Sequence, residues 1–315
     1  MKKIYTVCGE ISTKELGCTL LHEHLVATDW NVRMGIPGWL DFEAVCREVG
    51  EKLRVISQQY GIHTIGDLST WGLGRDVNIM RRISEISGVH VFCATGFYAD
   101  DKPFFRGASD ETMLEYLMGE IHDGIQGTGI RPAVIKCATT EKGVTPHNER
   151  QLWACAKAQM ASGLPLFTHT YPHNESGLKQ QDVFEKAGVD LRHVVIGHCG
   201  DSNEIEYLEK ILKRGSYIGL DRFGQDKHNT FENRMAVLIE LLKRGYIRQI
   251  IISHDHICYE NNDKYDRKAR VEMEDETIDL RYIHRFVIPR LKEAGFSDRD
   301  VEQLLVENPK DIFEK

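Results

Sequence analysis

The sequence lacks any long hydrophobic run. Nowhere do about 18 apolar residues follow one another, and residues 1–10 hold no apolar stretch that could be the core of a signal peptide. The first absence excludes a membrane-spanning helix, and the second predicts a protein that stays in the cytoplasm. The glycine-rich patterns G-x-G-x-x-G and G-x-x-x-x-G-K-[ST] are also missing, which argues against a dinucleotide or nucleoside-triphosphate site.

Closely spaced cysteines and an excess of positive charge are absent as well. The eight cysteines include no C-x-x-C pair, and 315 residues can fold around a core without disulfides, so we expect free buried thiols. Lys and Arg number 40 against 48 Asp and Glu, a net charge of −8. This balance offers no basic surface for nucleic acid or an anionic membrane. The hydrophobic content of 41% excludes a disordered chain.

What the sequence does contain is eight short apolar segments, which alternate with longer segments of helical periodicity. Such near-continuous apolar runs are typical of strands covered on both faces, as in a parallel sheet. We therefore predict an α/β fold, a (β/α)8 TIM barrel, forming one domain over residues 1–315. A doubly wound open sheet is the alternative, but no glycine-rich loop follows any strand. The predicted strands are 19–24, 63–69, 90–96, 133–138, 165–170, 194–200, 217–221 and 250–255.

Helix start and stop signals separate these strands. In 202–215 a serine precedes an apolar stripe at helical spacing, and a Lys-Arg-Gly triplet ends the segment. The segment 235–245 ends in the same triplet. The longest irregular stretch lies between Asp255 and Asp279, and loops of that length are usually functional or disordered. The other predicted helices are 42–60, 75–87, 109–126, 149–161, 177–187 and 279–294.

Several histidines lie at the carboxyl ends of the predicted strands, and TIM barrels have their active sites at these ends. His22 and His24 end the first strand, and side-chain alternation points both to the same face. His169 and His198 end the fifth and sixth strands, and Asp255 ends the eighth. Imidazoles and carboxylates from converging strands suit zinc and similar divalent ions. The pattern predicts a metal site.

Lys136 is unusual because it ends an apolar strand, where an unpaired ammonium group is costly. Burial among cations lowers the pKa of a lysine, and a neutral amine can add carbon dioxide to form a carbamate. A carbamate is an anion that can bridge two metal ions. Together with one aspartate and one hydroxide it would reduce the charge of two divalent ions from +4 to about +1.

These ligand types, in this order and on these strand ends, resemble the phosphotriesterase family of the binuclear-metal amidohydrolases. The resemblance runs from about residue 7 to residue 309. The segments 94–98, 197–201, 220–224 and 253–255 are most similar to the phosphotriesterase-like lactonases. A sister group carries a glutamate in place of the bridging lysine, and Lys136 argues against that group.

The resemblance implies two divalent metal ions, zinc first, with manganese, cobalt or iron as alternatives. It implies that Tyr98 orients the substrate carbonyl, and that Arg222 with Asp201 receives a proton passed on by Asp255. It also implies a homodimer. The metal ligands by resemblance are His22, His24 and Asp255 for the more buried ion, His169 and His198 for the more exposed ion, and carboxylated Lys136 as the bridge.

The predicted reaction is the opening of a lactone ring by a metal-bridging hydroxide, with phosphotriester hydrolysis as a side activity. A dedicated organophosphate phosphotriesterase is one alternative. The loop 259–276 departs from the apolar loop of lactonases for long acyl chains, because it carries Lys264, Arg267, Lys268 and Arg270. If Arg267 or Arg270 contacts substrate, phosphorylated sugar lactones become the alternative substrates. A non-enzymatic barrel with a structural metal is a further alternative.

Each candidate also has a structural interpretation. Asp255 could cap a helix, Lys136 could extend along the surface, and Tyr98 could simply pack at the mouth of the barrel. Arg222 and Asp201 could form a structural ion pair. By alternation Glu23, His254 and His256 point away from the metal site, and we expect structural roles for them.

Overall fold

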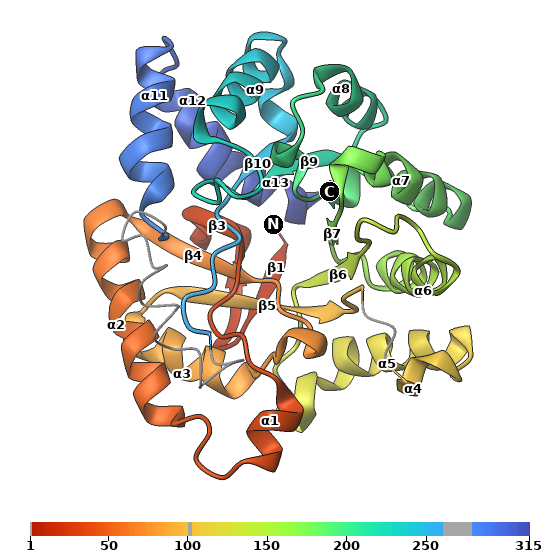
Figure 1. The fold of residues 1–315 in the computed structure, drawn as a ribbon. Helices are drawn as coiled ribbons and strands as arrows, with labels where there is room; N and C mark the ends of the chain where they lie inside the picture. Colours follow the sequence, from red (N-terminus) through yellow and green to blue (C-terminus); the bar gives the residue numbers. More distant parts are fainter. Residues whose placement is uncertain (1, 100–102, 261–278) are drawn as a thin grey trace.

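Eight parallel strands form the barrel that the sequence predicts. The computed structural model describes residues 2–99, 103–260 and 279–315. Within them the strands pair in the order β10-β9-β8-β7-β6-β5-β4-β3, and every pair is parallel (Figure 1). The strands are β3 (Cys18–Glu23), β4 (Ile62–Asp67), β5 (His90–Gly96), β6 (Val134–Ala138), β7 (Leu166–His169), β8 (Val194–Ile196), β9 (Tyr217–Leu220) and β10 (Ile250–Ile252).

The barrel closes between its first and last strands through the segments that follow them. The backbone N–H of Asp255 donates to the carbonyl of His22 at 3.0 Å. The N–H of His24 donates to the carbonyl of His256 at 2.9 Å, and that of Cys258 to the carbonyl of His24 at 2.9 Å. The closing seam therefore runs directly through the predicted metal ligands.

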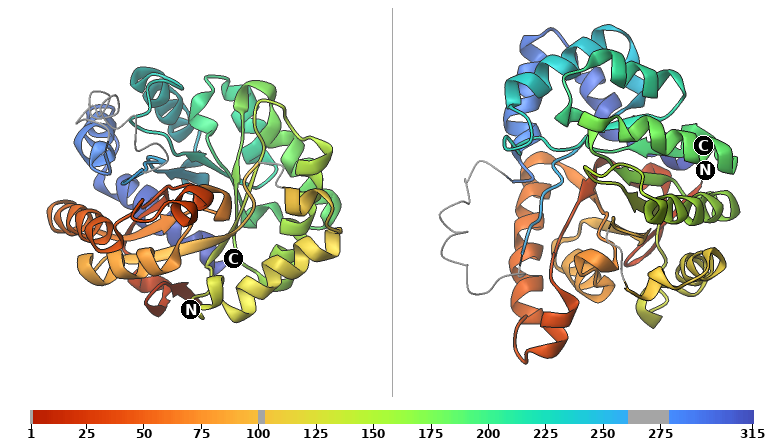
Figure 2. Two further views of the ribbon diagram at one scale, coloured as in Figure 1. Left: turned by 60° about the horizontal axis from the view of Figure 1, so that its bottom comes forward. Right: turned by 45° about the vertical axis from the view of Figure 1, so that its right-hand side comes forward.

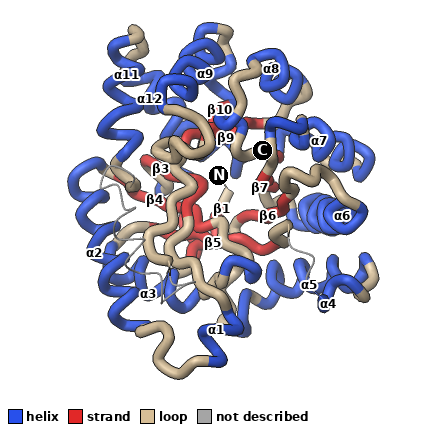
Figure 3. Tube along the Cα trace, in the orientation of Figure 1, coloured by secondary structure: helices blue, strands red, loops and turns tan. Residues whose placement is uncertain are grey.

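Helices form the outer layer around the strands (Figures 2 and 3). The segment 42–60 shows why they form where predicted: the Asp41 carboxylate accepts from the N–H of Ala44 at the start, and Gly61 ends α2 in the left-handed conformation, φ 68°. The helices are α1 (Trp30–Gly35), α2 (Phe42–Tyr60), α3 (Val77–Ser87), α4 (Pro103–Arg106), α5 (Asp110–Asp123), α6 (Pro146–Ser162), α7 (Ser176–Ala187), α8 (Ile205–Lys213), α9 (Phe231–Lys243), α11 (Ile288–Glu293), α12 (Asp298–Glu302) and α13 (Asn308–Glu314).

Some elements were not predicted. An antiparallel hairpin of β1 (Lys3–Thr6) and β2 (Gly9–Ser12) precedes the barrel, and its strands are too short to give a clear periodic signal. The short helices α1, α4, α12 and α13 were also missed. The predicted helix 279–294 is a π-helical turn at Ile283–Val287 that runs into α11. None of the helices in the described ranges is long and apolar enough to cross a bilayer.

An apolar cluster fills the interior of the barrel. It takes residues from β3 and from each of β5 to β10. At the amino end of the barrel Ile4, Leu16, Ile312 and Phe313 join the same cluster and close that end. Chemistry is therefore confined to the carboxyl ends of the strands. The strand residues of this cluster are Leu21, Phe92, Ala94, Val134, Phe167, Val195, Tyr217 and Ile251.

Candidate metal centre

Two of the predicted ligands reach the interior by simple strand alternation. Lys136 lies two residues after Val134 on β6, and His169 lies two residues after Phe167 on β7. Since Val134 and Phe167 belong to the interior cluster, alternation directs the side chains of Lys136 and His169 to the same face, one layer closer to the mouth.

His22 and His198 reach the interior only because the backbone departs from regular strand geometry. Leu21 is already in the interior cluster, so alternation alone would turn His22 outward. The pairing of β3 with β4 shifts register between Leu20 and Glu23, and such irregularities re-aim side chains at barrel rims. His198 follows β8 in the left-handed conformation, φ 59°. This strained conformation turns the ring inward.

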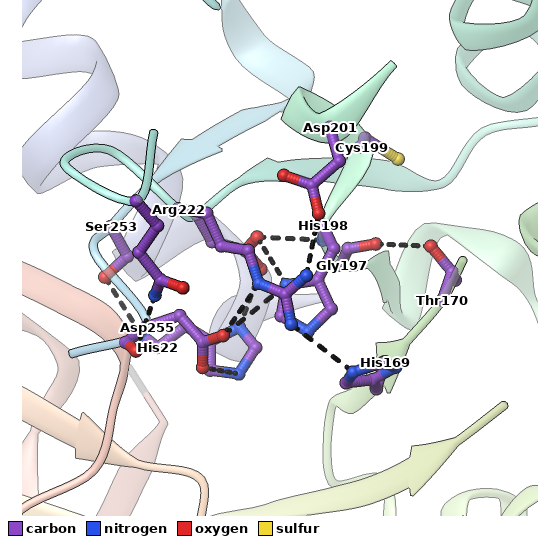
Figure 4. Close-up of polar contacts among 12 residues, drawn as sticks. His22, His169, Thr170, Gly197, His198, Cys199, Asp201, Arg222, Ser253 and Asp255 are labelled. Carbon is purple, nitrogen blue, oxygen red and sulfur yellow. Dashed lines mark hydrogen bonds and ion pairs between the residues drawn. The ribbon is translucent and has the colours of Figure 1, made fainter. Parts of the chain in front are cut away.

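The side chains of His22, His198 and Asp255 meet at the carboxyl ends of three strands (Figure 4). One potential ligand atom from each lies within 4.8 Å of the others, as a shared cation requires. The ring centroids of His22 and His198 are 5.1 Å apart. His169 joins them with its ring centroid 4.3 Å from that of His198. These four residues come from strand ends that are distant in sequence.

Lys136 completes this cluster from the floor of the site. Its side chain is 1% exposed, and its Nζ lies 2.8 Å from Nε2 of His22. Burial lowers the pKa of Lys136 from 10.5 to about 8, a shift that Asp255 and Asp221 partly oppose. The neutral amine is therefore more available near neutral pH than that of an exposed lysine.

The Asp221 carboxylate orients two of the imidazoles. Its Oδ2 lies 2.6 Å from Nδ1 of His22, and its Oδ1 lies 3.0 Å from Nδ1 of His198. Oδ1 also accepts from the backbone N–H of His198 at 2.8 Å. Each ring thus uses Nδ1 outside the centre and leaves Nε2 for a metal, an arrangement usual for ligating histidines.

The remaining two imidazoles are fixed in the same way. Nδ1 of His24 lies 2.8 Å from Oγ of Ser69, and Nδ1 of His169 lies 2.9 Å from the carbonyl of Thr139. Nε2 of His198 is buried and has no hydrogen-bond partner among the described residues. A buried imidazole nitrogen without a partner is costly, so the donor set fits a divalent cation. Burial, and to a smaller degree Lys136, lowers the pKa of His22 to about 4, which keeps this ring neutral as a ligand must be.

Asp255 contacts two of the histidines and Arg222. Its Oδ1 is 3.1 Å from Nε2 of His24 and 3.4 Å from Nε2 of His22. Its Oδ2 accepts from Nε of Arg222 at 2.9 Å. Burial by itself raises the pKa of this carboxyl, but His198, His22, His24 and Arg222 outweigh burial and hold the pKa well below its ordinary value. Asp255 is therefore an anion.

Arg222 connects Asp255 to a second carboxylate, as Figure 4 shows. Its Nη1 donates to Oδ2 of Asp201 at 2.7 Å, and its Nη2 lies 3.4 Å from Nε2 of His169. The other oxygen of Asp201 accepts from the fully buried Arg234 at 2.8 Å. Tyr98 lies at the edge of the site, where its ring meets that of His169 edge-on at 5.4 Å.

The structure thus brings together the predicted ligands, Tyr98, Arg222 and Asp201. Arg267 and Arg270, with Lys264 and Lys268, lie outside the described residues. The prediction missed the residues that orient the ligands: Asp221, Ser69, Thr139 and Arg234. Of these only Asp221 carried a signal, because it directly follows an apolar strand and precedes Arg222.

Comparison with known proteins identifies the family. The profile of the Phosphotriesterase family matches residues 2–313. The chain belongs to the phosphotriesterase family. The resemblance seen in the sequence is therefore confirmed, and with it a hydrolase fold whose members typically depend on metal.

Members of the phosphotriesterase family from other organisms match over nearly their whole length. The phosphotriesterase homology protein of Mycobacterium tuberculosis is 36% identical over 327 residues, covering 100% of this chain and 98% of that protein. The aryldialkylphosphatase of Saccharolobus solfataricus is 33% identical over 307 residues, covering 96% of each chain. The solved structure of the phosphotriesterase from Mycobacterium tuberculosis superposes with a TM-score of 0.93 over 99% of this chain and 98% of that one, at 36% identity.

Proposed function

We propose that this phosphotriesterase-family hydrolase opens lactone rings at a binuclear metal centre. One observation supports the centre above all others: four imidazoles have Nδ1 held by a partner outside the centre, which leaves their Nε2 atoms for metal. Nε2 of His24 lies near Asp255 and Nε2 of His22 near the buried Lys136. A structural zinc site has four protein ligands and no open position. A set of six mixed donors around a lysine instead suits two ions.

The proposed assignment of ligands to the two ions follows the family resemblance. His22, His24 and Asp255 would hold one ion, because Oδ1 of Asp255 lies 3.1 Å from Nε2 of His24 and 3.4 Å from Nε2 of His22. His169 and His198 would hold the second ion. Lys136, as a carbamate, would bridge the two. Zinc suits these nitrogen and oxygen donors, and manganese, cobalt or iron are the alternatives.

The bound ions would supply a hydroxide nucleophile near neutral pH and polarise the substrate carbonyl. The protein residues handle the proton and the substrate. Asp255 lies between the centre and Arg222, so it can take a proton and deliver it to the leaving alkoxide. Arg222, fixed by Asp201, keeps Asp255 oriented and ionised. Tyr98, packed on the edge of His169, would orient the carbonyl of the bound substrate.

The substrate class is the finer part of the proposal. Lactones and phosphotriesters both present an electrophile with a polarisable oxygen and a leaving alkoxide, so one site can serve both. The relative named aryldialkylphosphatase supports phosphotriester hydrolysis as a side activity or as the alternative function. Phosphorylated sugar lactones are the substrates to test if Arg267 and Arg270 contact the ligand.

The test of substrate class is a comparison of kcat/KM across acyl-homoserine lactones, γ- and δ-lactones, phosphorylated sugar lactones and paraoxon. We expect at least one lactone to exceed paraoxon by tenfold or more, about 1.4 kcal/mol in transition-state binding. Turnover of paraoxon above every lactone would reverse the order in favour of a dedicated phosphotriesterase. We also propose that the chain forms one domain and a homodimer, and light scattering would test the dimer.

A further inference from the structure

Glu23 lies between His22 and His24 in the sequence, yet its carboxylate faces the closing seam of the barrel. It is 0% exposed. Oε1 accepts from Oγ of Ser253 at 2.8 Å and from the N–H of His254 at 3.0 Å. Oε2 accepts from the N–H of His256 at 2.9 Å. Among the described residues no lysine or arginine forms an ion pair with it, so hydrogen-bond donors alone offset its burial.

Glu23 contacts residues 253–256, and this segment leaves the sheet at the position of Asp255. β10 ends at Ile252, and Ser253 makes the last backbone bonds toward β9. Asp255 then adopts the left-handed conformation, φ 52°, which is uncommon for a residue with a side chain. This kink removes the N–H groups of His254 and His256 from the ladder. Glu23 accepts from both and so stabilises a backbone conformation that would otherwise be costly.

His254 extends the same network beyond the seam. Its Nδ1 lies 2.8 Å from Oε1 of Glu23, and its Nε2 accepts from the backbone N–H of Ile283 at 3.2 Å. Since Nε2 is an acceptor, the ring is neutral and carries its proton on Nδ1. The structural role expected for His254 is therefore specific: it joins Glu23 to the start of the π-helical turn Ile283–Val287.

We propose that Glu23 is a positioning residue of the metal centre. By accepting from the backbone on both sides of Asp255, it holds Oδ1 of Asp255 within 3.1 Å of Nε2 of His24. The side chain of Glu23 points away from the proposed ligands, yet it determines the position of one of them, Asp255. The inference rests on the proposed function, because it assigns Asp255 to a metal ion.

Glu120 provides a matched control. Its carboxylate is also buried, at 8% exposure, and accepts from Oγ1 of Thr95 at 2.6 Å and from the phenol of Tyr116 at 2.8 Å, besides its ion pair with Arg75. None of the metal-centre residues is among these partners. Glu120→Gln should therefore lower the stability of the fold without changing the metal site.

The experiment compares Glu23→Gln and Glu120→Gln in two measurements. The first is amide hydrogen exchange of the metal-free proteins, and the second is the binding and visible absorption spectrum of Co²⁺. In Glu23→Gln an amide NH₂ group replaces one carboxylate oxygen. This NH₂ group would face one of the O–H or N–H groups from which Glu23 now accepts a hydrogen bond. We expect faster exchange in 253–258 and about 10–100-fold weaker Co²⁺ binding with an altered spectrum for Glu23→Gln only.

Unchanged Co²⁺ affinity and spectrum in a folded Glu23→Gln protein would overturn the proposal. Glu23 would then serve only to stabilise the closing seam of the barrel. Equal Co²⁺ losses in both variants would overturn it too, since they would report general destabilisation. If Glu23→Gln fails to fold, Glu23→Asp, which keeps the carboxylate but shortens the side chain by one methylene group, provides the same comparison with a smaller expected loss. Failure of the proposed metal centre is distinguishable, because the wild-type protein itself would then bind no Co²⁺. Failure of the lactone specificity alone would leave the Co²⁺ comparison unaffected.

Discussion

Nδ1 of His22 lies 2.6 Å from Oδ2 of Asp221, and this contact fixes both the orientation and the tautomer of the ring. The second oxygen of the same carboxylate performs the same function for His198. One buried aspartate therefore orients ligands proposed for two different metal ions. Burial by itself raises the pKa of Asp221, but His198 and His22 hold it well below its ordinary value, so the group is an anion.

Replacing Asp221 with Ala should weaken the binding of both ions. Without the carboxylate, Nδ1 of His22 and of His198 would lose their partner, and either ring could rotate or change tautomer. We expect about a 10–100-fold loss of metal affinity, measured by competition with a chelator. Loss of only one ion would show that a single histidine depends on Asp221.

Gly219→Ala tests the contact of Asp221 with His22 and His198 by displacing the carboxylate instead of removing it. A Cβ at this position would lie 2.5 Å from Oδ2 of Asp221 and 3.2 Å from Cα of Gly197, so the carboxylate would have to move. We expect a loss of about 1–3 kcal/mol in the free energy of unfolding, together with weaker metal binding. Gly107→Ala is the control, because a Cβ there meets nothing within 4 Å. Wild-type metal affinity in Gly219→Ala would contradict the role given to Asp221.

Lys136→Met should remove the bridge while keeping much of the apolar volume of the side chain. The carbamate proposed at Lys136 is the ligand that both ions share, so we expect bound metal to fall below that of the wild-type protein and hydrolysis to fall by orders of magnitude. Metal analysis and lactone assays on the same samples measure both effects. Full metal content with full activity would exclude a bridging role for Lys136.

Arg222→Met should affect turnover more than metal content. Arg222 contacts Asp255 through Oδ2, whereas His24 contacts Oδ1, so the proposed ligand atom Oδ1 would keep its position. Loss of a charged hydrogen bond to a buried carboxylate costs about 1.5–3 kcal/mol, which corresponds to roughly a 10–100-fold lower kcat. An equal decrease of kcat in Asp201→Asn would support Asp201 as the residue that orients Arg222. Loss of metal in Arg222→Met would instead assign Arg222 to the stability of the centre.

The pH dependence of stability should reveal the half-buried His284. Burial, and then His254, lowers the pKa of His284 from 6.5 to about 4. Between these values the unfolded chain binds the proton and the folded chain does not, so the free energy of unfolding falls as the pH decreases from about 6.5 to about 4. His284→Asn should reduce this loss by about 1–3 kcal/mol, measured by urea unfolding of the metal-free proteins at pH 7 and pH 5. A variant with the wild-type pH dependence would show that His284 does not contribute.

The barrel and the residues that cluster at its carboxyl end were predictable from the sequence because they follow from local patterns. Apolar runs of strand length gave β3 to β10, and ligand types at strand ends gave His22, Lys136 and His169. The directions of His22 and His198 were not predictable in this way, since both depend on backbone irregularities, a register shift and a positive φ. Contacts between distant strands, such as that of Asp221 with His22, cannot be predicted from the periodicity of apolar residues in the sequence.

The most direct test of the binuclear centre is the metal content of the purified, reconstituted protein, measured as zinc per chain while lactone hydrolysis is followed on the same samples. We expect activity to rise with zinc until about two ions are bound per chain, and we expect His22→Ala and His169→Ala each to lower both quantities. Saturation of activity at one ion per chain, or full activity of the metal-free protein, would contradict a binuclear hydrolase.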